Sequence, residues 1–198
     1  MDNNENEFSP QESLRLISSM IETTKNSIKD NSFYFLLWGW AVLLACVGQY
    51  YLKVVANYSN NGIVWLIIPV AFIIQVVFII KEKKKERVRT FIGEAYTYLW
   101  TAVGLSFFVL AFIFNKAGWE YSSVFYILLY AIGTYVSGRL IKFRPLFIGG
   151  MICFPLAILT TYLAADQQLI MLALAILISY IIPGHLLRIK NRKQQSHV

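Results

Sequence analysis

The chain has 198 residues, of which 57 % are hydrophobic and 15 % charged, with a mean hydropathy of +0.54 and a net charge of +7. Soluble domains carry about a quarter charged residues, so this composition excludes an ordinary soluble domain and indicates an integral membrane protein. Stretches without charge cover 31–52, 54–80, 95–115, 121–138, 145–165 and 167–184. About 20 helical residues cross a bilayer core, so each stretch is long enough to span a membrane.

An arm precedes these stretches. Residues 1–8 are polar and acidic, and we expect them to be disordered. Ser9, with Glu12 three positions later, matches a capping box. This pattern predicts a helix over 9–30.

The arm helix is amphipathic. Leu14, Ile17 and Ile21 recur at helical spacing and form one apolar face. Three roles are open for this face: it could lie on the membrane, pack against the bundle, or bind a cytoplasmic partner protein.

Six transmembrane helices follow, so the expected fold class is all-α, a polytopic membrane helix bundle. Their approximate ranges are 32–52, 62–80, 92–114, 120–138, 145–165 and 167–187, within a transmembrane unit over 31–187. A basic tail covers 188–198.

The basic residues predict the orientation. Of the 18 Lys and Arg, all but two lie in the arm, in the loops near 81–89 and 139–144, or in the tail. The exceptions are Lys53 and Lys116, which lie in the alternate loops. Basic loops stay in the cytoplasm, so both termini are expected inside. Cations at the ends of spans also meet anionic headgroups, which explains the net charge without a nucleic-acid partner.

Charged residues near the spans are few. Glu94 lies about one turn inside the third span, and Arg139 lies at the cytoplasmic end of the fourth. An intramembrane charge is costly and is usually paired. Two interpretations have equal weight: Glu94 pairs with Arg139 or Arg188, or it reaches water among the headgroups.

Gln49 and Gln75 are the uncharged polar candidates inside the spans. Their amides could hydrogen-bond across helices or line a path for a solute. For Gln75 the structural role is favoured, because the rest of its span is apolar.

The sequence offers little for catalysis. It contains two histidines, His185 and His197, and no phosphate loop, paired-carboxylate motif or zinc-binding motif. We therefore expect no enzymatic activity, no cofactor and no metal. Cys46 and Cys153 fall inside spans and are expected to be small packing residues.

A weak internal repeat is present. Tyr34, Leu37 and Trp38 begin the first span with the spacing that Tyr96, Leu99 and Trp100 show in the third. A duplicated hairpin would produce this match, and so would aromatic residues that anchor span ends at the interface.

The stretch from Glu12 to Trp40, ESLRLISSMIETTKNSIKDNSFYFLLWGW, resembles the start of a family of small, uncharacterised integral membrane proteins of Bacteroidota. Pro183-Gly184 before a basic tail is similar to the end of that family. The resemblance implies a multi-pass protein of the bacterial cytoplasmic (inner) membrane, without known catalytic or binding residues.

The function expected from the sequence is that of a non-enzymatic interaction, regulatory or sensor protein acting through its cytoplasmic helix. The alternative is a small-solute transporter or channel subunit. The expected partners are the lipid bilayer, a cytoplasmic protein and, as an open alternative, a second copy of the chain.

Overall fold

The computed structural model describes residues 9, 11, 12, 14, 15, 32–83 and 91–195. Within these residues every regular element is a helix, so the predicted all-α class is confirmed. The predicted disorder of 1–8, most of the arm and the centre of the loop near 81–89 lie outside the described residues.

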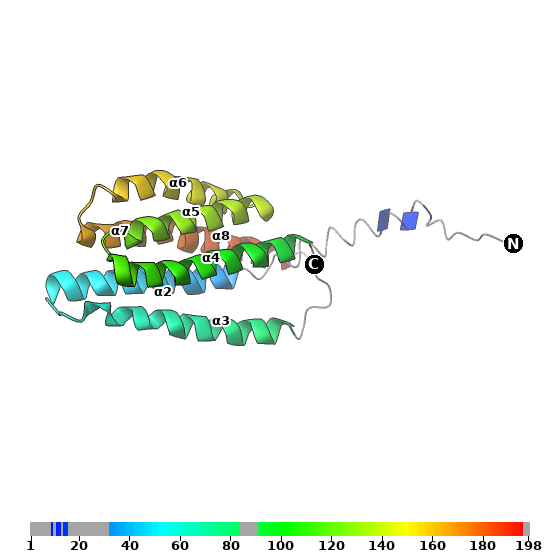
Figure 1. The fold of residues 1–198 in the computed structure, drawn as a ribbon. Coiled ribbons are helices and arrows are strands. Elements are labelled where there is room, and N and C mark those ends of the chain that lie inside the picture. Colours follow the sequence, from blue (N-terminus) through cyan, green and yellow to red (C-terminus); the bar gives the residue numbers. More distant parts are fainter. Residues whose placement is uncertain (1–8, 10, 13, 16–31, 84–90, 196–198) are drawn as a thin grey trace.

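The helices run as one bundle of roughly parallel and antiparallel rods (Figure 1). In chain order they are α2 (Ser32–Tyr50), a π-helical turn (Tyr51–Val55), a 3₁₀ helix (Asn61–Leu66), α3 (Ile67–Lys83), α4 (Phe91–Ala117), α5 (Ser122–Leu140), α6 (Arg144–Thr160), α7 (Ala165–Ile176), a second π-helical turn (Leu177–Ile181) and α8 (Ile182–Gln195).

Five helical stretches are long and apolar enough to cross a membrane. They are Ser32–Val55, Asn61–Lys81, Phe91–Ala117, Ser122–Leu140 and Ala165–Lys193. The stretch predicted as a fifth span, 145–165, contains the shorter apolar helix α6, with 17 residues. At 1.5 Å per residue, α6 is about 25 Å long, somewhat less than a hydrocarbon core of about 30 Å.

The early end of α6 has a local cause. The Thr160 hydroxyl donates to the carbonyl of Leu156, and the Thr161 hydroxyl donates to that of Ile158. The next amides form tight i→i−3 bonds, as in Leu163 N–H to Thr160. Tight bonds of this type are common in the last turn of a helix, and the chain turns over 161–164 before α7 begins.

Packing divides the helices into a core and a periphery. The stretch from α7 to α8 contacts α2, α5 and α6, and α5 packs on α6, whereas α3 packs on α2, and α4 packs mainly on α5. Few residues are buried in the most apolar part of two stretches: 6 % in Asn61–Lys81 and 11 % in Phe91–Ala117. The corresponding fraction in Ser122–Leu140 is 44 %. α3 and α4 therefore present most of their apolar surface outward.

Glycine brings the core helices together. A Cβ on Gly138 of α5 would overlap the backbone of Phe147 in α6, and one on Gly150 of α6 would lie 2.5 Å from the nitrogen of Tyr135 in α5. The two helices therefore meet backbone to backbone, as small residues allow in membrane bundles. α5 and α6 have the closest contact in the bundle.

The π-helical turn Leu177–Ile181 also fits against glycines. Gly39 of α2 faces Ile181 and Tyr180, and Gly149 of α6 faces the carbonyl of Ile178. Pro183 follows this turn and has no N–H to donate, so the regular hydrogen-bond ladder cannot continue through it. The helix continues as α8, and the whole stretch reaches Gln195. It therefore extends well beyond the predicted span 167–187.

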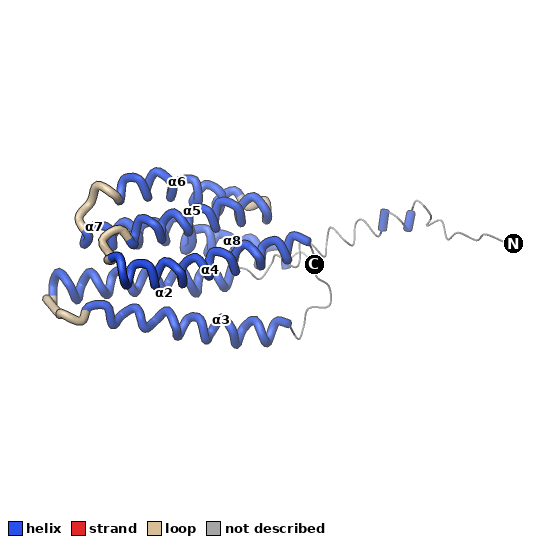
Figure 2. The backbone as a smooth tube through the Cα atoms, viewed as in Figure 1, coloured by secondary structure: helices blue, strands red, loops and turns tan. Residues whose placement is uncertain are grey.

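The two ends of the bundle differ. Figure 2 shows the α2–α3, α4–α5 and α6–α7 connections together at one end. The α5–α6 turn (141–143), the start of α2 and the last turns of α8 lie at the other. We call the latter the basic end, because it carries Arg139, Lys142, Arg144, Arg188, Lys190, Arg192 and Lys193.

Candidate functional site

Two tryptophans form hydrogen bonds between neighbouring helices. The indole N–H of Trp38 in α2 donates to Oε1 of Gln75 in α3 over 2.6 Å. The indole N–H of Trp100 in α4 donates to Oγ of Ser137 in α5 over 3.0 Å. In both cases 37 positions separate donor and acceptor. The bonds join the two helices of each hairpin.

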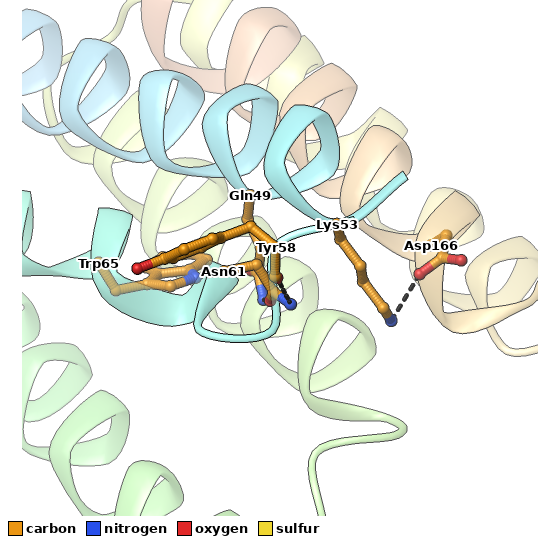
Figure 3. Close-up of polar contacts among 6 residues, drawn as sticks. All are labelled: Gln49, Lys53, Tyr58, Asn61, Trp65 and Asp166. Atoms are coloured by element: carbon orange, nitrogen blue, oxygen red, sulfur yellow. Dashed lines mark hydrogen bonds and ion pairs between the residues drawn. The ribbon is translucent and has the colours of Figure 1, made fainter. Parts of the chain in front are cut away.

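Gln49 connects the far end of α2 to the chain that leads into α3 (Figure 3). Its Oε1 accepts the indole N–H of Trp65 over 2.7 Å, and its Nε2 donates to Oδ1 of Asn61 over 3.1 Å. Asn61 Nδ2 in turn donates to the carbonyl of Tyr58 over 3.2 Å. Both Gln49 and Gln75 thus make side-chain hydrogen bonds within the first hairpin.

An ion pair joins two hairpins at the same end. Lys53 Nζ lies 2.6 Å from Oδ1 of Asp166, in the first turn of α7 (Figure 3). The two side chains are 42 % and 44 % exposed. An exposed pair of this kind contributes at most about 1 kcal/mol, so it aligns the helix ends more than it stabilises the bundle.

Aromatic rings fill the centre of the bundle. Phe35 of α2 and Trp100 of α4 both pack edge-on against Tyr180, which also meets Tyr130 of α5 with centroids 5.1 Å apart. Phe35, Tyr130 and Tyr180 are at most 7 % exposed. Edge-to-face contacts of this type stabilise beyond the burial of area, and they close the space between four helices.

The predicted ion pair of Glu94 with Arg139 or Arg188 is not formed. Among the described residues the ion pair present is Lys53–Asp166. Glu94 is exposed in the first turn of α4, and the Arg139 guanidinium lies 4.7 Å from the centroid of the Phe147 ring. The reason is electrostatic, because a helix stabilises acids in its first turn and bases in its last. Arg139 lies in the last turn of α5, so each charge has a favourable place without the other.

The start of the arm has the predicted cap. The Ser9 hydroxyl accepts the Glu12 N–H over 3.2 Å, and Oε2 of Glu12 accepts the Ser9 N–H over 3.1 Å. The capping box is therefore confirmed. Leu14 is 65 % exposed. Ile17 and Ile21, the rest of the predicted face, lie outside the described residues.

The remaining candidates for chemistry are sparse. Over the described ranges, no three His, Cys, Asp or Glu side chains lie close enough to share a metal ion. Cys46 and Cys153 are unpaired thiols, 1 % and 0 % exposed. A shallow groove of about 420 Å³ runs between α4 and α5 and is lined by Leu105, Ser106, Val109, Leu110, Phe125, Leu128 and Leu129.

Sequence reasoning missed the partners of the tryptophans. It placed Trp38 and Trp100 at the interface by residue type, although each N–H is bonded to a neighbouring helix. The sequence repeat was the available signal, because Gln75 follows Trp38, and Ser137 follows Trp100, by the same 37 positions in the chain.

None of the family models, curated proteins or solved structures compared with this chain matches it.

Proposed function

We propose that this chain is a six-span protein of the bacterial cytoplasmic membrane, with both termini inside, which binds a cytoplasmic protein through its arm helix. In this proposal α6 crosses the membrane as the fifth span, and the basic end faces the cytoplasm. The role is that of an interaction or regulatory component without catalysis.

The observation that carries this proposal is the exposed apolar side chain on a capped helix. Leu14 follows the Ser9–Glu12 capping box and is 65 % exposed. A cap stabilises the start of a helix by about 1 kcal/mol, so the arm has a reason to be helical. Its apolar face then needs a partner, since an exposed amphipathic face commonly seats in a groove of another protein.

The orientation is supported by the charges. The described cations Arg139, Lys142, Arg144, Arg188 and Lys190 gather at one end of the bundle, which the positive-inside tendency assigns to the cytoplasm. The other end holds Lys53, which is paired with Asp166.

The transporter alternative has less support. Gln49 and Gln75, the polar side chains that could line a path, are engaged by Trp65 and Trp38. The aromatic rings of Phe35, Trp100 and Tyr180 occupy the centre of the bundle. Both features favour a structural role for the polar groups in the spans.

A photo-crosslinking amino acid placed at Leu14 of the full chain, in living cells, tests the proposal. We expect one discrete crosslinked protein, which disappears when Ile17→Asn and Ile21→Asn are added while the chain is still recovered in membranes. The same crosslinker at Arg15, also exposed but on a different face, should yield little. The variant Gln75→Leu should leave the crosslink unchanged.

Three results would contradict the proposal. Crosslinks from position 14 to lipid would place the arm on the membrane. Crosslinks to the chain's own helix bundle would place the arm against that bundle. Equal crosslinking from positions 14 and 15 would show that no face is selected.

A further inference from the structure

We propose that the α5–α6 turn and α8 together bind the phosphate of an anionic phospholipid, through Lys142, Arg144 and Lys190 with Arg139 beside them. This inference depends on the bundle lying in a membrane. It does not depend on the partner of the arm, so either proposal can fail without the other.

The three central cations lie next to Phe143, one in space and two in the chain. Lys190 Nζ of α8 lies 5.4 Å from the centroid of the Phe143 ring, and Lys142 and Arg144 flank Phe143 in the chain. Phe143 itself is 7 % exposed, whereas all three cations are exposed. The buried ring thus positions Lys190 of α8 against the α5–α6 turn, whose own cations Lys142 and Arg144 are exposed.

Aromatic rings, and not carboxylates, contact two of these cations. Arg139 lies over Phe147 and Lys190 over Phe143, both at the start of α6. Within the described part of the chain, none of Arg139, Lys142, Arg144 and Lys190 has an acidic partner within ion-pair distance. A cation–π contact orients a cation but leaves its net charge in place, so the cluster remains ready for an anion.

The backbone of the turn also holds its cation outward. Lys142 has a φ of +51° in a turn closed by the N–H of Phe143 donating to the carbonyl of Gly138 over 2.9 Å. A lysine in the left-handed region is uncommon. Asn is the side chain that tolerates this region best after glycine, which provides a variant without charge or new strain.

The position of the cations identifies a lipid as the ligand. On α6, the exposed side chains of Ile148 and Ile152 follow Arg144 at four-residue spacing. On α8, the exposed side chains of Ile182 and Leu186 precede Lys190 at the same spacing.

Residues four apart share a helix face, so each apolar stripe has a cation one turn away, before the stripe on α6 and after it on α8. The two helices are in contact. This arrangement matches a phospholipid, whose acyl chains would lie on the stripes while its phosphate meets the cations. A soluble phosphate or a nucleic acid has no acyl chains that would contact the apolar stripes.

Native mass spectrometry of the full chain in detergent, with equal amounts of phosphatidylglycerol and phosphatidylcholine of identical acyl chains, tests this inference. We expect the wild-type chain to retain phosphatidylglycerol preferentially. The variant Lys142→Asn/Lys190→Gln should reduce that preference by roughly twenty-fold, because each cation near a lipid surface contributes about five-fold.

The matched control is Arg188→Gln/Arg192→Gln, which removes two charges from the same end of the bundle. It should keep most of the preference. Equal losses in the two variants would indicate diffuse surface attraction and overturn the site, as would equal retention of both lipids by the wild-type chain.

Two further measurements test the inference. Soluble glycerophosphate at the same concentration as the lipid should not displace the bound phosphatidylglycerol. Displacement would overturn the inference and identify a site for a soluble anion instead. If the double variant does not fold, Lys190→Gln against Lys190→Arg replaces it, with the preference lost in the first and kept in the second.

Discussion

Individual polar side chains in this bundle act as links between helices. The indole N–H groups of Trp38, Trp65 and Trp100 each donate to a Gln or Ser on another segment. Inside a bilayer an unpaired N–H is costly because no water is present to accept it. Each link therefore satisfies a donor and fixes the rotation of one helix against its neighbour.

Replacing Trp38 by Phe should lower thermal stability in detergent. The change keeps an aromatic ring but removes the N–H that Gln75 accepts, and interhelical bonds of this kind contribute about 0.5–1.5 kcal/mol. We expect a fall of a few degrees in the unfolding temperature. Trp40→Phe is the control, because Trp40 is 46 % exposed.

A double-mutant cycle separates the bond from the ring. If the Trp38–Gln75 bond carries the effect, Gln75→Leu should destabilise the wild-type chain but be nearly neutral in the Trp38→Phe background. Additive losses in the two backgrounds would show that the side chains act independently.

Glu94→Gln should leave the free energy of unfolding unchanged to within about 0.5 kcal/mol. Glu94 is exposed and lacks an ion-pair partner among the described residues. The measurement is thermal unfolding in detergent, with Asp166→Asn as a comparison that does remove an ion pair. A clear loss of stability in Glu94→Gln would restore the ion pair predicted from the sequence.

These residues show what the sequence could and could not predict. Gln49 and Gln75 were identifiable because amides are rare inside apolar spans. Their partners were not, because a hydrogen bond depends on the rotation of both helices. The sequence left Glu94 open between an ion pair with Arg139 or Arg188 and contact with headgroup water, because closeness to the same membrane face does not put two side chains on facing helix surfaces.

The first two hairpins are built alike. The α2–α3 and α4–α5 pairs each place a Trp near the basic end of the first helix and its acceptor 37 positions later on the second. One turn before each acceptor stands a buried small residue, Ala71 or Gly133. A Cβ on Gly133 would lie 2.9 Å from the ring of Trp100. The second interpretation of the sequence repeat, interface anchoring alone, does not account for the matching acceptors.

Close packing of α5 and α6 depends on Gly138. Gly138→Ala should destabilise the chain by more than about 3 kcal/mol, because the added methyl group overlaps the backbone of Phe147 and neither helix can move away cheaply. Thermal unfolding in detergent measures the change. The matched control is Gly104→Ala in α4, where a Cβ would meet no atom within 4 Å.

The control should be neutral or slightly stabilising, because alanine is the better helix former by up to about 1 kcal/mol. Losses of similar size at both positions would mean that glycine flexibility, and not close approach, matters at Gly138.

Element boundaries were the least predictable part of the fold. Charge-free stretches located each apolar helix, but hydropathy continues past Thr160 into the α6–α7 turn and past Ile176 through a π-helical turn. The end of α6 is followed by i→i−3 backbone bonds from Thr161 to Leu163, and the irregular turn comes just before Pro183. Both are local hydrogen-bond effects that a sum of hydrophobicity does not register.

At the scale of the whole molecule, packing and charge are both asymmetric. α2, α5, α6 and the α7–α8 stretch form a core with glycine contacts, and α3 and α4 lie at its edge. Most of the described cations belong to helix ends and a turn that lie together at one end of that core. A bundle with most of the surface of two helices turned outward suits a lipid solvent, where exposed apolar side chains carry no penalty.

The number of membrane crossings decides whether the N-terminus and the C-terminus lie on the same side of the membrane. If α6 crosses, the α5–α6 and α6–α7 turns lie on opposite sides of the membrane, and six spans return the chain to its starting side. Its length of about 25 Å is short, but a bilayer can thin locally at a modest cost. Arg144 can also extend toward the headgroups from the start of α6. We therefore expect α6 to span.

Single cysteines and a membrane-impermeant maleimide test this in intact cells expressing the full chain. Tyr58→Cys in the α2–α3 connection and Tyr162→Cys in the α6–α7 turn should react from outside, while Arg192→Cys on α8 should react only after lysis. The native Cys46 and Cys153 are buried and should stay silent. Reaction of Tyr58→Cys without Tyr162→Cys would mean that α6 stays on the cytoplasmic side, so that the α7–α8 stretch is the fifth crossing and Arg192→Cys also reacts from outside. External labelling of Arg192→Cys without Tyr58→Cys would instead reverse the orientation that the basic end predicts.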